Sequence, residues 1–432
     1  MNETPQPQQH PEWCYSAVLY EMNLRQLTRE GTLRAAEQRL EFLHAMGIDA
    51  VWLMPVYPIG EEGRKGSLGS YYSIRDYCAV NDEFGTMADF DSFVAKAHSL
   101  GMKVLLDWVA NHTSRDAVWM RERPADWYER NEDGTAKVPW DWTDTAKLNY
   151  ANHDVWRAQI EAMRFWVEQH DVDGFRCDMA EMVPVEFWEW AIPQVKEAYP
   201  EIIFIAEVYN PNEYRNYLFR GKFDYLYDKV DLYDTLRNVA CGYESAASIT
   251  HCWQSLNGIE KKMLNFLENH DEQRIASDFF AGDPRKGIPA LIVSACMNTN
   301  PMMIYFGQEF GEPGMDSEGF SGRDGRTTIF DYWSIDSIRR WRNGGKFDGK
   351  MLNEDHKRLY EIYQRVLTLC NEEPAIAKGV FFDLMYANQN GWRFNEHKQY
   401  TFMRKYKNEL LFIIVNFDSQ LVDVAINVPS HA

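Results

Sequence analysis

Short apolar runs alternate along the chain with longer segments in which apolar residues recur every three or four positions. The short runs are rich in β-branched and aromatic residues, which is typical of buried strands, and the longer period is typical of helices that cover a sheet with one face. This alternation predicts parallel strands joined by helices. The predicted strands span residues 17–22, 50–54, 103–106, 174–177, 202–206, 223–227, 263–267 and 303–306.

Between these runs, helices are predicted over residues 32–46, 87–100, 153–170, 185–199 and 289–298. Leu33, Leu40 and Leu43 illustrate the helical period, and Pro184 stands where helices often begin. Eight strands that alternate with helices predict an α/β fold, a closed (β/α)8 TIM barrel. We expect the barrel to comprise residues 1–112 and 153–372.

Three connections, 57–83, 113–152 and 308–350, are too long for simple turns. Each follows the carboxyl end of a predicted strand, which is the active-site face of such barrels. Residues 113–152 are predicted to form a short excursion domain after the third strand. After a helix over 354–370, strand-like runs at 379–386, 400–405, 411–417 and 421–428 predict a small all-β domain over 373–432. The chain stops soon after the last run, which leaves open that this domain is truncated.

Composition and charge limit the kinds of partner that the protein can bind. The 432 residues include 45 Lys and Arg against 65 Asp and Glu, a net charge of −20, so the surface should repel nucleic acid and anionic lipid. No apolar run reaches membrane-spanning length, and the polar N-terminus has no signal-peptide pattern. Seven cysteines without CxxC spacing indicate reduced thiols. We expect a cytoplasmic protein; an exported protein whose signal peptide is absent from this chain is the alternative, and the oligomeric state stays open.

Four of the predicted strands end in carboxylates: Asp107, Asp178 and Glu207 directly follow three of them, and the fourth runs into Glu268-Asn-His-Asp271. In a barrel these side chains would converge on one mouth. Buried carboxylates are costly unless they are paired, so their gathering needs a reason. Two common reasons are metal binding and acid/base with nucleophilic chemistry at an acetal carbon, which requires one ionised and one protonated carboxyl group.

The segments around these acids resemble the four signature regions of the α-amylase family of glycoside hydrolases, in the family's order. They read Asp107-Trp-Val-Ala-Asn-His112, Gly174-Phe-Arg-Cys-Asp178, Ala206-Glu207-Val208 and Phe266-Leu-Glu-Asn-His-Asp271. Each motif alone is weak, whereas the ordered set is highly specific. The resemblance covers roughly residues 18–370, and the trailing β domain also fits the family.

The resemblance implies a retaining hydrolase of α-glucosidic bonds, mainly α-1,4, in maltodextrin or starch-type oligosaccharides and polysaccharides. By it, Asp178 is the nucleophile, Glu207 is the general acid that then becomes the base, and Asp271 stabilises the transition state. No cofactor is required for this chemistry.

The resemblance also implies a set of residues that hold the substrate or the catalytic acids. Arg176 would keep Asp178 ionised, and His112 and His270 would bond sugar hydroxyls. Tyr72 would stack beneath the sugar, and Asp107 would orient this network.

The sequence departs from the family at Glu181-Met182, where typical α-amylases carry a Lys-His pair. That histidine commonly lends a calcium ligand, so no metal site is predicted; Asn111 remains a candidate ligand and calcium stays open as a cofactor. The same departure, on the expected acceptor side, favours an alternative: a transglycosylase or trehalose-forming isomerase. A glucan-binding protein without turnover is a third reading, against which the three intact acids argue. Trp119, Trp127, Trp140 and Trp142 are either sugar platforms or loop packing.

Overall fold

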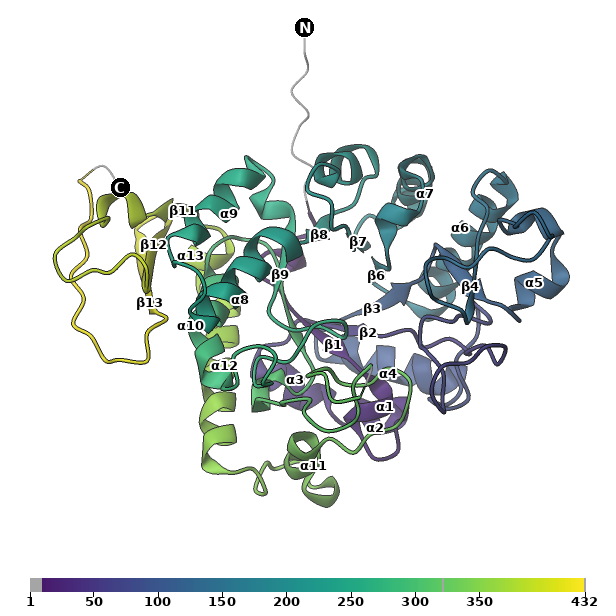
Figure 1. The fold of residues 1–432 in the computed structure, drawn as a ribbon, viewed down its shortest axis with the longest axis horizontal. Coiled ribbons are helices and arrows are strands. Elements are labelled where there is room, and N and C mark those ends of the chain that lie inside the picture. The colour runs from purple at the N-terminus through teal and green to yellow at the C-terminus, as the bar shows by residue number, and fades with distance from the viewer. Residues whose placement is uncertain (1–9, 321, 431–432) are drawn as a thin grey trace, which may run out of the picture.

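Eight parallel strands close into a barrel in the order β1-β10-β9-β8-β7-β6-β3-β2. Figure 1 shows labelled strands of this barrel near the centre of the molecule, among them β1, β3 and β6. The structure is a computed structural model and describes residues 10–320 and 322–430. Each strand starts and ends within two residues of its predicted run, which confirms the fold class. The barrel strands are β1 (Val18–Met22), β2 (Ala50–Leu53), β3 (Lys103–Trp108), β6 (Gly174–Cys177), β7 (Ile203–Ala206), β8 (Tyr225–Tyr227), β9 (Met263–Phe266) and β10 (Met302–Tyr305).

Helices surround the barrel. The α-helices are α1 (Leu24–Leu27), α2 (Leu33–Glu37), α3 (Leu40–Met46), α4 (Met87–Ser99), α5 (Val118–Glu122), α6 (His153–His170), α7 (Val185–Ala198), α8 (Asp234–Cys241), α9 (Ser248–Leu256), α10 (Ile288–Cys296), α11 (Asp336–Arg342), α12 (Glu354–Glu372) and α13 (Pro374–Ala377). Shorter 3₁₀ turns are η1 (Glu12–Cys14), η2 (Ala125–Trp127), η3 (Ala180–Met182), η6 (Glu260–Lys262), η7 (Pro284–Gly287), η8 (Gln308–Phe310), η9 (Asn343–Gly345) and η10 (Met385–Ala387). Two π-helical turns are η4 (Asn216–Arg220) and η5 (Lys229–Tyr233).

Local chemistry explains several helix ends. Thr86 and Asp89 form a reciprocal capping box that starts α4, and Gly47, at φ 96°, ends α3 in the left-handed conformation. The single helix predicted over residues 32–46 is wrong, because α2 ends before Arg39. The Arg39 N–H bonds the Ala36 carbonyl in a tighter turn, and its side chain is fully buried. The burial of Arg39 in the tertiary structure therefore interrupts the single helix that the apolar period predicts.

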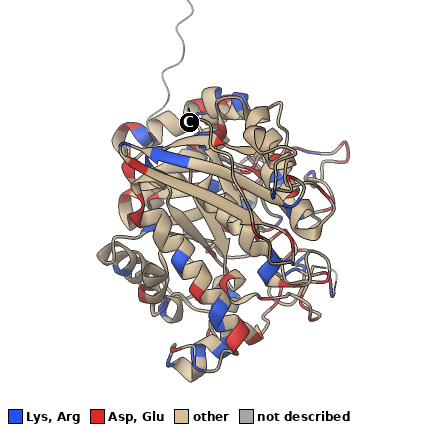
Figure 2. Ribbon diagram, turned by 90° about the vertical axis from the view of Figure 1, so that its left-hand side faces the viewer, with Lys and Arg blue, Asp and Glu red and all other residues tan. Residues whose placement is uncertain are grey.

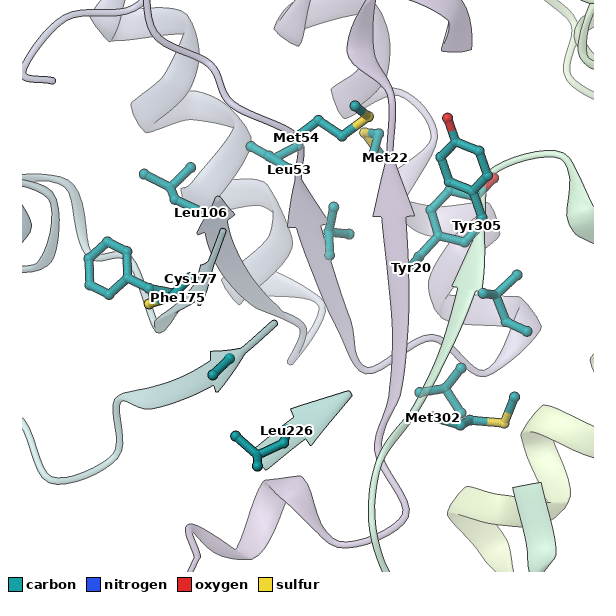
Figure 3. Packing of buried hydrophobic residues seen from close by; sticks show 14 of the residues in the cluster. Tyr20, Met22, Leu53, Met54, Leu106, Phe175, Cys177, Leu226, Met302 and Tyr305 are labelled. Atoms are coloured by element: carbon teal, nitrogen blue, oxygen red, sulfur yellow. The ribbon is translucent and has the colours of Figure 1, made fainter. Parts of the chain in front are cut away.

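Strand residues alternate between two apolar layers, as the pleat requires. Leu19, Trp52 and Leu105 point into the barrel and form an inner cluster with residues of the other strands. Their neighbours form a larger outer cluster with the helices. Figure 3 shows part of this outer layer, including Tyr20 and Phe175. The same alternation places Arg176, between Phe175 and Cys177, on the inner side of β6.

The excursion after β3 is a small antiparallel pair, β4 (His112–Ser114) and β5 (Thr145–Lys147). At the C-terminus, β11 (Val380–Asp383), β12 (Gln399–Tyr406) and β13 (Glu409–Asn416) form an antiparallel sheet, which faces the viewer in Figure 2. The fourth predicted run, 421–428, is not a strand: it lies along the 388–393 turn, where Ala425 N–H bonds the Arg393 carbonyl. Domain boundaries within the chain stay predictions.

Arg404 ties the C-terminal sheet to the barrel helices. Its buried guanidinium donates to the carbonyls of Ala375, Ile376 and Gly379 around α13 and to that of Met297 at the end of α10. One side chain of β12 therefore satisfies four carbonyl groups. Among the helices of the described residues, none is long and apolar enough to cross a membrane.

Candidate active site

Arg176 is the centre of the carboxylate cluster that the sequence predicts. Nη1 of its buried guanidinium donates to Oδ1 of Asp178 at 2.9 Å and to both carboxylate oxygens of Asp107 at 3.1 and 3.2 Å. Nη2 donates to Oε2 of Glu207 at 2.7 Å, and Nε donates to the Tyr227 hydroxyl at 2.9 Å. The ends of β3, β6, β7 and β8 thus meet at one guanidinium, because parallel barrel strands end on the same face.

The acids around Arg176 share its charge unequally. Burial raises the pKa of Asp178 well above its ordinary value; Arg176 opposes this, but Glu207, Asp107 and Asp271 add to it. Burial likewise raises the pKa of Asp107 to about 6, against the pull of Arg176. Arg176 thus favours the ionised form of Asp178, as the resemblance implies, while burial and the neighbouring carboxylates act in the opposite direction.

Glu207 has a second set of partners besides Arg176. Its Oε2 also accepts from the backbone N–H of Met179 at 2.8 Å, and its Oε1 accepts from the Tyr209 hydroxyl at 2.5 Å. Met179 has a left-handed backbone, at φ 41°, directly after the predicted nucleophile. This turn aims an N–H group at Glu207 and so couples the two carboxylates through the backbone.

His270 lies between two carboxylates. Its Nδ1 is 2.6 Å from Oε1 of Glu21, and its Nε2 is 3.2 Å from Oδ2 of Asp271 and 2.7 Å from the Tyr72 hydroxyl. Burial alone would lower the pKa of His270, but Asp271 and Glu21 outweigh it and raise this pKa well above its ordinary value. His270 and Arg176 in turn hold the pKa of Asp271 below its ordinary value, although burial opposes them. The Tyr72 ring stacks on the His270 ring at 5.1 Å and its hydroxyl donates to Asp107.

His112 presents one ring nitrogen to the site. Its Nδ1 is 3.1 Å from the amide nitrogen of Asn111, and burial lowers its pKa to about 4. A neutral ring whose Nδ1 accepts from Asn111 carries its proton on Nε2, which makes Nε2 a donor. Trp142 packs against the ring at 5.2 Å.

A cavity of about 630 Å³ opens over this cluster at the carboxyl ends of the strands. Among its lining residues are Tyr72, His112, Asp178, Glu207, His270 and Asp271. Arg176 and Asp107 do not line it, because both are fully buried behind its wall. The structure therefore brings all the predicted site residues together, but it separates those that face the cavity from the two that hold them in place.

The four tryptophans of the 113–152 excursion also differ in whether they line the cavity. Trp142 lines the cavity, whereas Trp119 and Trp127 pack edge to face on each other, with Trp127 4% exposed. Trp140 is 74% exposed, and its Nε1 donates to the sulfur of Met182. Neither Glu181 nor Met182 lines the catalytic cavity.

One residue of the family's usual calcium site is missing here, because Met182 offers only a thioether in place of the histidine. The amide nitrogen of Asn111 bonds His112, which leaves its amide oxygen as a candidate ligand. No group of three or more His, Cys, Asp or Glu side chains within the described chain is placed to hold a metal ion. Calcium as a cofactor stays open, as the sequence leaves it.

Sequence reasoning missed Glu21, Tyr209 and Tyr227. Glu21 left a signal, since it is a lone charge inside the apolar run of β1. Tyr209 follows Glu207 by two residues, but nothing in the chain sets it apart from the other tyrosines. Tyr227 is the last residue of β8, and no acid of the site follows this strand. A pattern of carboxylates at strand ends therefore does not point to Tyr227.

The fold and the carboxylate cluster define a barrel enzyme that acts on glycosidic bonds. The family model described as the alpha amylase catalytic domain matches residues 15–379, so the chain belongs to the alpha-amylase family of glycoside hydrolases.

Individual relatives support this assignment. Alpha-amylase MalA of Haloarcula japonica is 30% identical over 330 residues, covering 71% of this chain and 46% of the relative. An alpha-1,4-glucan:maltose-1-phosphate maltosyltransferase of Rhodospirillum rubrum is 38% identical over 218 residues, covering 45% and 31%. The chain thus spans less than half the length of these two curated relatives. The crystal structure of a noncanonic maltogenic alpha-amylase, AmyB of Thermotoga neapolitana, superposes with a TM-score of 0.75 at 28% identity and covers 93% of this chain and 86% of AmyB.

Proposed function

We propose that this protein is a retaining hydrolase of α-1,4-glucosidic bonds in maltodextrin or starch-type substrates. The observation that carries the proposal is the shared guanidinium of Arg176, which binds Asp178 and Glu207 at the floor of one cavity. Retaining chemistry requires two carboxyl groups about 5–5.5 Å apart, and a common guanidinium partner keeps two carboxylates at short range. Asp271 supplies the third acid on the same wall.

In this mechanism the Asp178 carboxylate attacks the anomeric carbon and forms a covalent glycosyl–enzyme ester. The bond to the leaving oxygen breaks, and that oxygen takes the proton of Glu207. A water molecule then gives its proton to Glu207 and attacks the same carbon, which releases the sugar with its original anomeric configuration and restores the Asp178 carboxylate. Asp271 stabilises the positive charge that develops on the sugar ring between these states.

The remaining residues position the substrate or the acids. The Nε2–H of His112 faces the cavity and would donate to a sugar hydroxyl, while Tyr72 would form an apolar platform. Asp107 touches Tyr72 and Arg176 but not the cavity, so it acts as a positioning residue.

The test uses Asp178→Asn and Glu207→Gln, which keep the shapes of the side chains. Each should lower the cleavage of maltoheptaose by about a thousandfold or more while the protein still binds the sugar. Asp49→Asn is the matched control, because it removes a partly buried carboxylate at the opposite end of the barrel, where Asp49 accepts from Val18 N–H. Proton NMR of the first sugar released should show the α anomer. Wild-type turnover in either site variant would refute the assignment, and an initial β anomer would refute retention.

A second candidate keeps the same active site and changes the acceptor, so that another sugar captures the glycosyl–enzyme. The maltosyltransferase relative favours it, whereas Glu181 and Met182, which the sequence places on the acceptor side, do not line the cavity. Met182 holds the exposed ring of Trp140, and Glu181 accepts from Asn210 N–H. Products from maltoheptaose, pullulan and sucrose decide between the two, since longer or rearranged sugars mean transfer and only shorter sugars mean hydrolysis. No turnover of any of these sugars by the folded wild type would instead favour the glucan-binding protein.

A further inference from the structure

A second cavity, of about 710 Å³, lies away from the catalytic site, between the start of α2 and the segment around α11. Figure 1 shows α11 at the lower edge of the molecule. One side of this cavity is formed by residues 29–38, and the other by residues 332–347. The two cavities are linked through one short segment, because Asp331 lines the catalytic cavity and Tyr332 lines the second one.

The charged side chains around this second cavity are mostly positive, although the chain as a whole is negative. Four arginines line it against one acid, Glu30, although the whole chain carries a net charge of −20. Two of the arginines have carboxylate partners, Arg34 with Asp89 and Arg339 with Asp336. The other two, Arg29 and Arg342, form no ion pair within the described residues.

These charges are close to one another. Burial lowers the pKa of Arg342, and Arg339 and Arg29 lower it further, while Tyr332 and Glu30 act in the opposite direction. Like charges that share a partly buried cavity repel each other, and one carboxylate does not neutralise them. A bound anion would remove this repulsion.

A fifth arginine lies directly behind the cavity. Arg39 is fully buried between the rings of Trp341 and Phe347, and Phe347 itself lines the cavity. None of the three side-chain nitrogens of Arg39 has a hydrogen-bond partner. Burial and the nearby Arg342 lower the pKa of Arg39 to about 9. A buried guanidinium without an acceptor is costly, and stacking on aromatic rings offsets only part of that cost.

We propose that this cavity binds an organic phosphate, a phosphate monoester carried on a sugar or nucleoside ring. The phosphate group lies between Arg29 and Arg342, whose planar guanidinium groups suit a dianion with three acceptor oxygens. The ring lies against Tyr332, which is 42% exposed, and Phe347. Arg39 supplies positive potential from behind. The site does not depend on the chemistry of the catalytic cavity.

Isothermal titration calorimetry of the full chain with glucose 1-phosphate, AMP and inorganic phosphate, at constant ionic strength, tests the proposal. We expect saturable one-site binding of at least one of the two esters, weakened by about tenfold or more in Arg29→Gln and in Arg342→Gln. Arg365→Gln, an exposed arginine of α12 outside the cavity, should bind as the wild type does. Tyr332→Ala should weaken the esters but not inorganic phosphate. The preferred ester shows whether a sugar or a nucleoside carries the phosphate.

Thermal unfolding of each variant shows whether it is folded, so that a loss of binding can be assigned to the cavity. Three results would overturn the proposal: no saturable binding of either ester by the wild type, binding that is unchanged in both arginine variants, or binding that maltoheptaose abolishes by competition in the Glu207→Gln protein. The last result would place the phosphate in the catalytic cavity. Inorganic phosphate that binds as tightly as both esters would refute the ring contact with Tyr332.

Discussion

Replacing Glu21 with Gln tests whether a buried carboxylate of β1 holds His270 protonated beside the predicted catalytic acids. Glu21 is fully buried, and its Oε1 lies 2.6 Å from Nδ1 of His270. The substitution keeps the shape of the side chain and an oxygen for the Nδ1–H, but it removes the negative charge. Asp271 then remains as the single carboxylate in contact with the ring.

The magnitude follows from this one contact. A hydrogen bond to a charged group contributes about 1.5–3 kcal/mol and a neutral one about 0.5–1.5 kcal/mol, so the loss of the charge should shift the protonation equilibrium of His270 about tenfold toward the neutral ring. The pKa of His270 is raised on folding, chiefly by Asp271 and Glu21 against the effect of burial. Protonated His270 therefore stabilises the fold fully below its ordinary pKa of 6.5, and this stabilisation is lost as the pH rises through the raised value. In Glu21→Gln the loss should be smaller and should be complete at a lower pH than in wild type.

The assay is an NMR titration of protein labelled with ¹³C-histidine, in which the His270 signal is assigned from its absence in His270→Asn. Urea unfolding across the same pH series reports the stability. Glu309→Gln is the matched control: Glu309 is a buried glutamate that accepts from the Tyr20 hydroxyl and has no contact with His270. A titration curve for His270 that is the same in Glu21→Gln and in wild type would refute the reasoning, as would an equal shift in the control.

Three further predictions concern the frame of the site. Arg404→Met leaves four carbonyl groups without their donor and should lower the free energy of unfolding, measured in urea, by about 3 kcal/mol or more. A change below about 1 kcal/mol would contradict the role of Arg404 in tying the C-terminal sheet to the barrel helices. Gly47→Ala should lower it by about 1–3 kcal/mol, because φ is 96° and a Cβ would lie 2.9 Å from the Leu367 backbone; an unchanged unfolding curve would contradict this. Dialysis against EDTA should leave the unfolding temperature unchanged, because Met182 replaces one of the family's usual ligands and no group of three or more His, Cys, Asp or Glu side chains among the described residues is placed to hold a metal ion; a fall would reveal a bound metal.

The barrel and its acids could be predicted from the sequence because both leave local signals. Each apolar run that forms a strand has a distinctive composition, and three of the acids follow such runs directly. Features that depend on a distant partner left no such signal. The run 421–428 has a strand-like pattern, but pairing needs a free edge in the right place, and the segment bonds the 388–393 turn instead. The break in the helix at Arg39 depends on Trp341 and Phe347, three hundred residues further along the chain.

The charge balance of the active site also depends on contacts between distant residues, so the sequence does not reveal it. The sequence places Asp107, Asp178 and Glu207 at one mouth but does not reveal that they share the single guanidinium of Arg176. His270 adds a second positive charge, yet it stands between Glu21 and Asp271 and is largely neutralised by them. Acids therefore outnumber bases around the fully buried Arg176. Burial raises the pKa of Asp178 and that of Asp107, and Arg176 opposes the rise in both cases, so these crowded acids bind protons more strongly than isolated acids would. The retaining mechanism that we propose needs one ionised and one protonated carboxyl group at short range, and the shared guanidinium of Arg176 holds Asp178 and Glu207 side by side for those two roles.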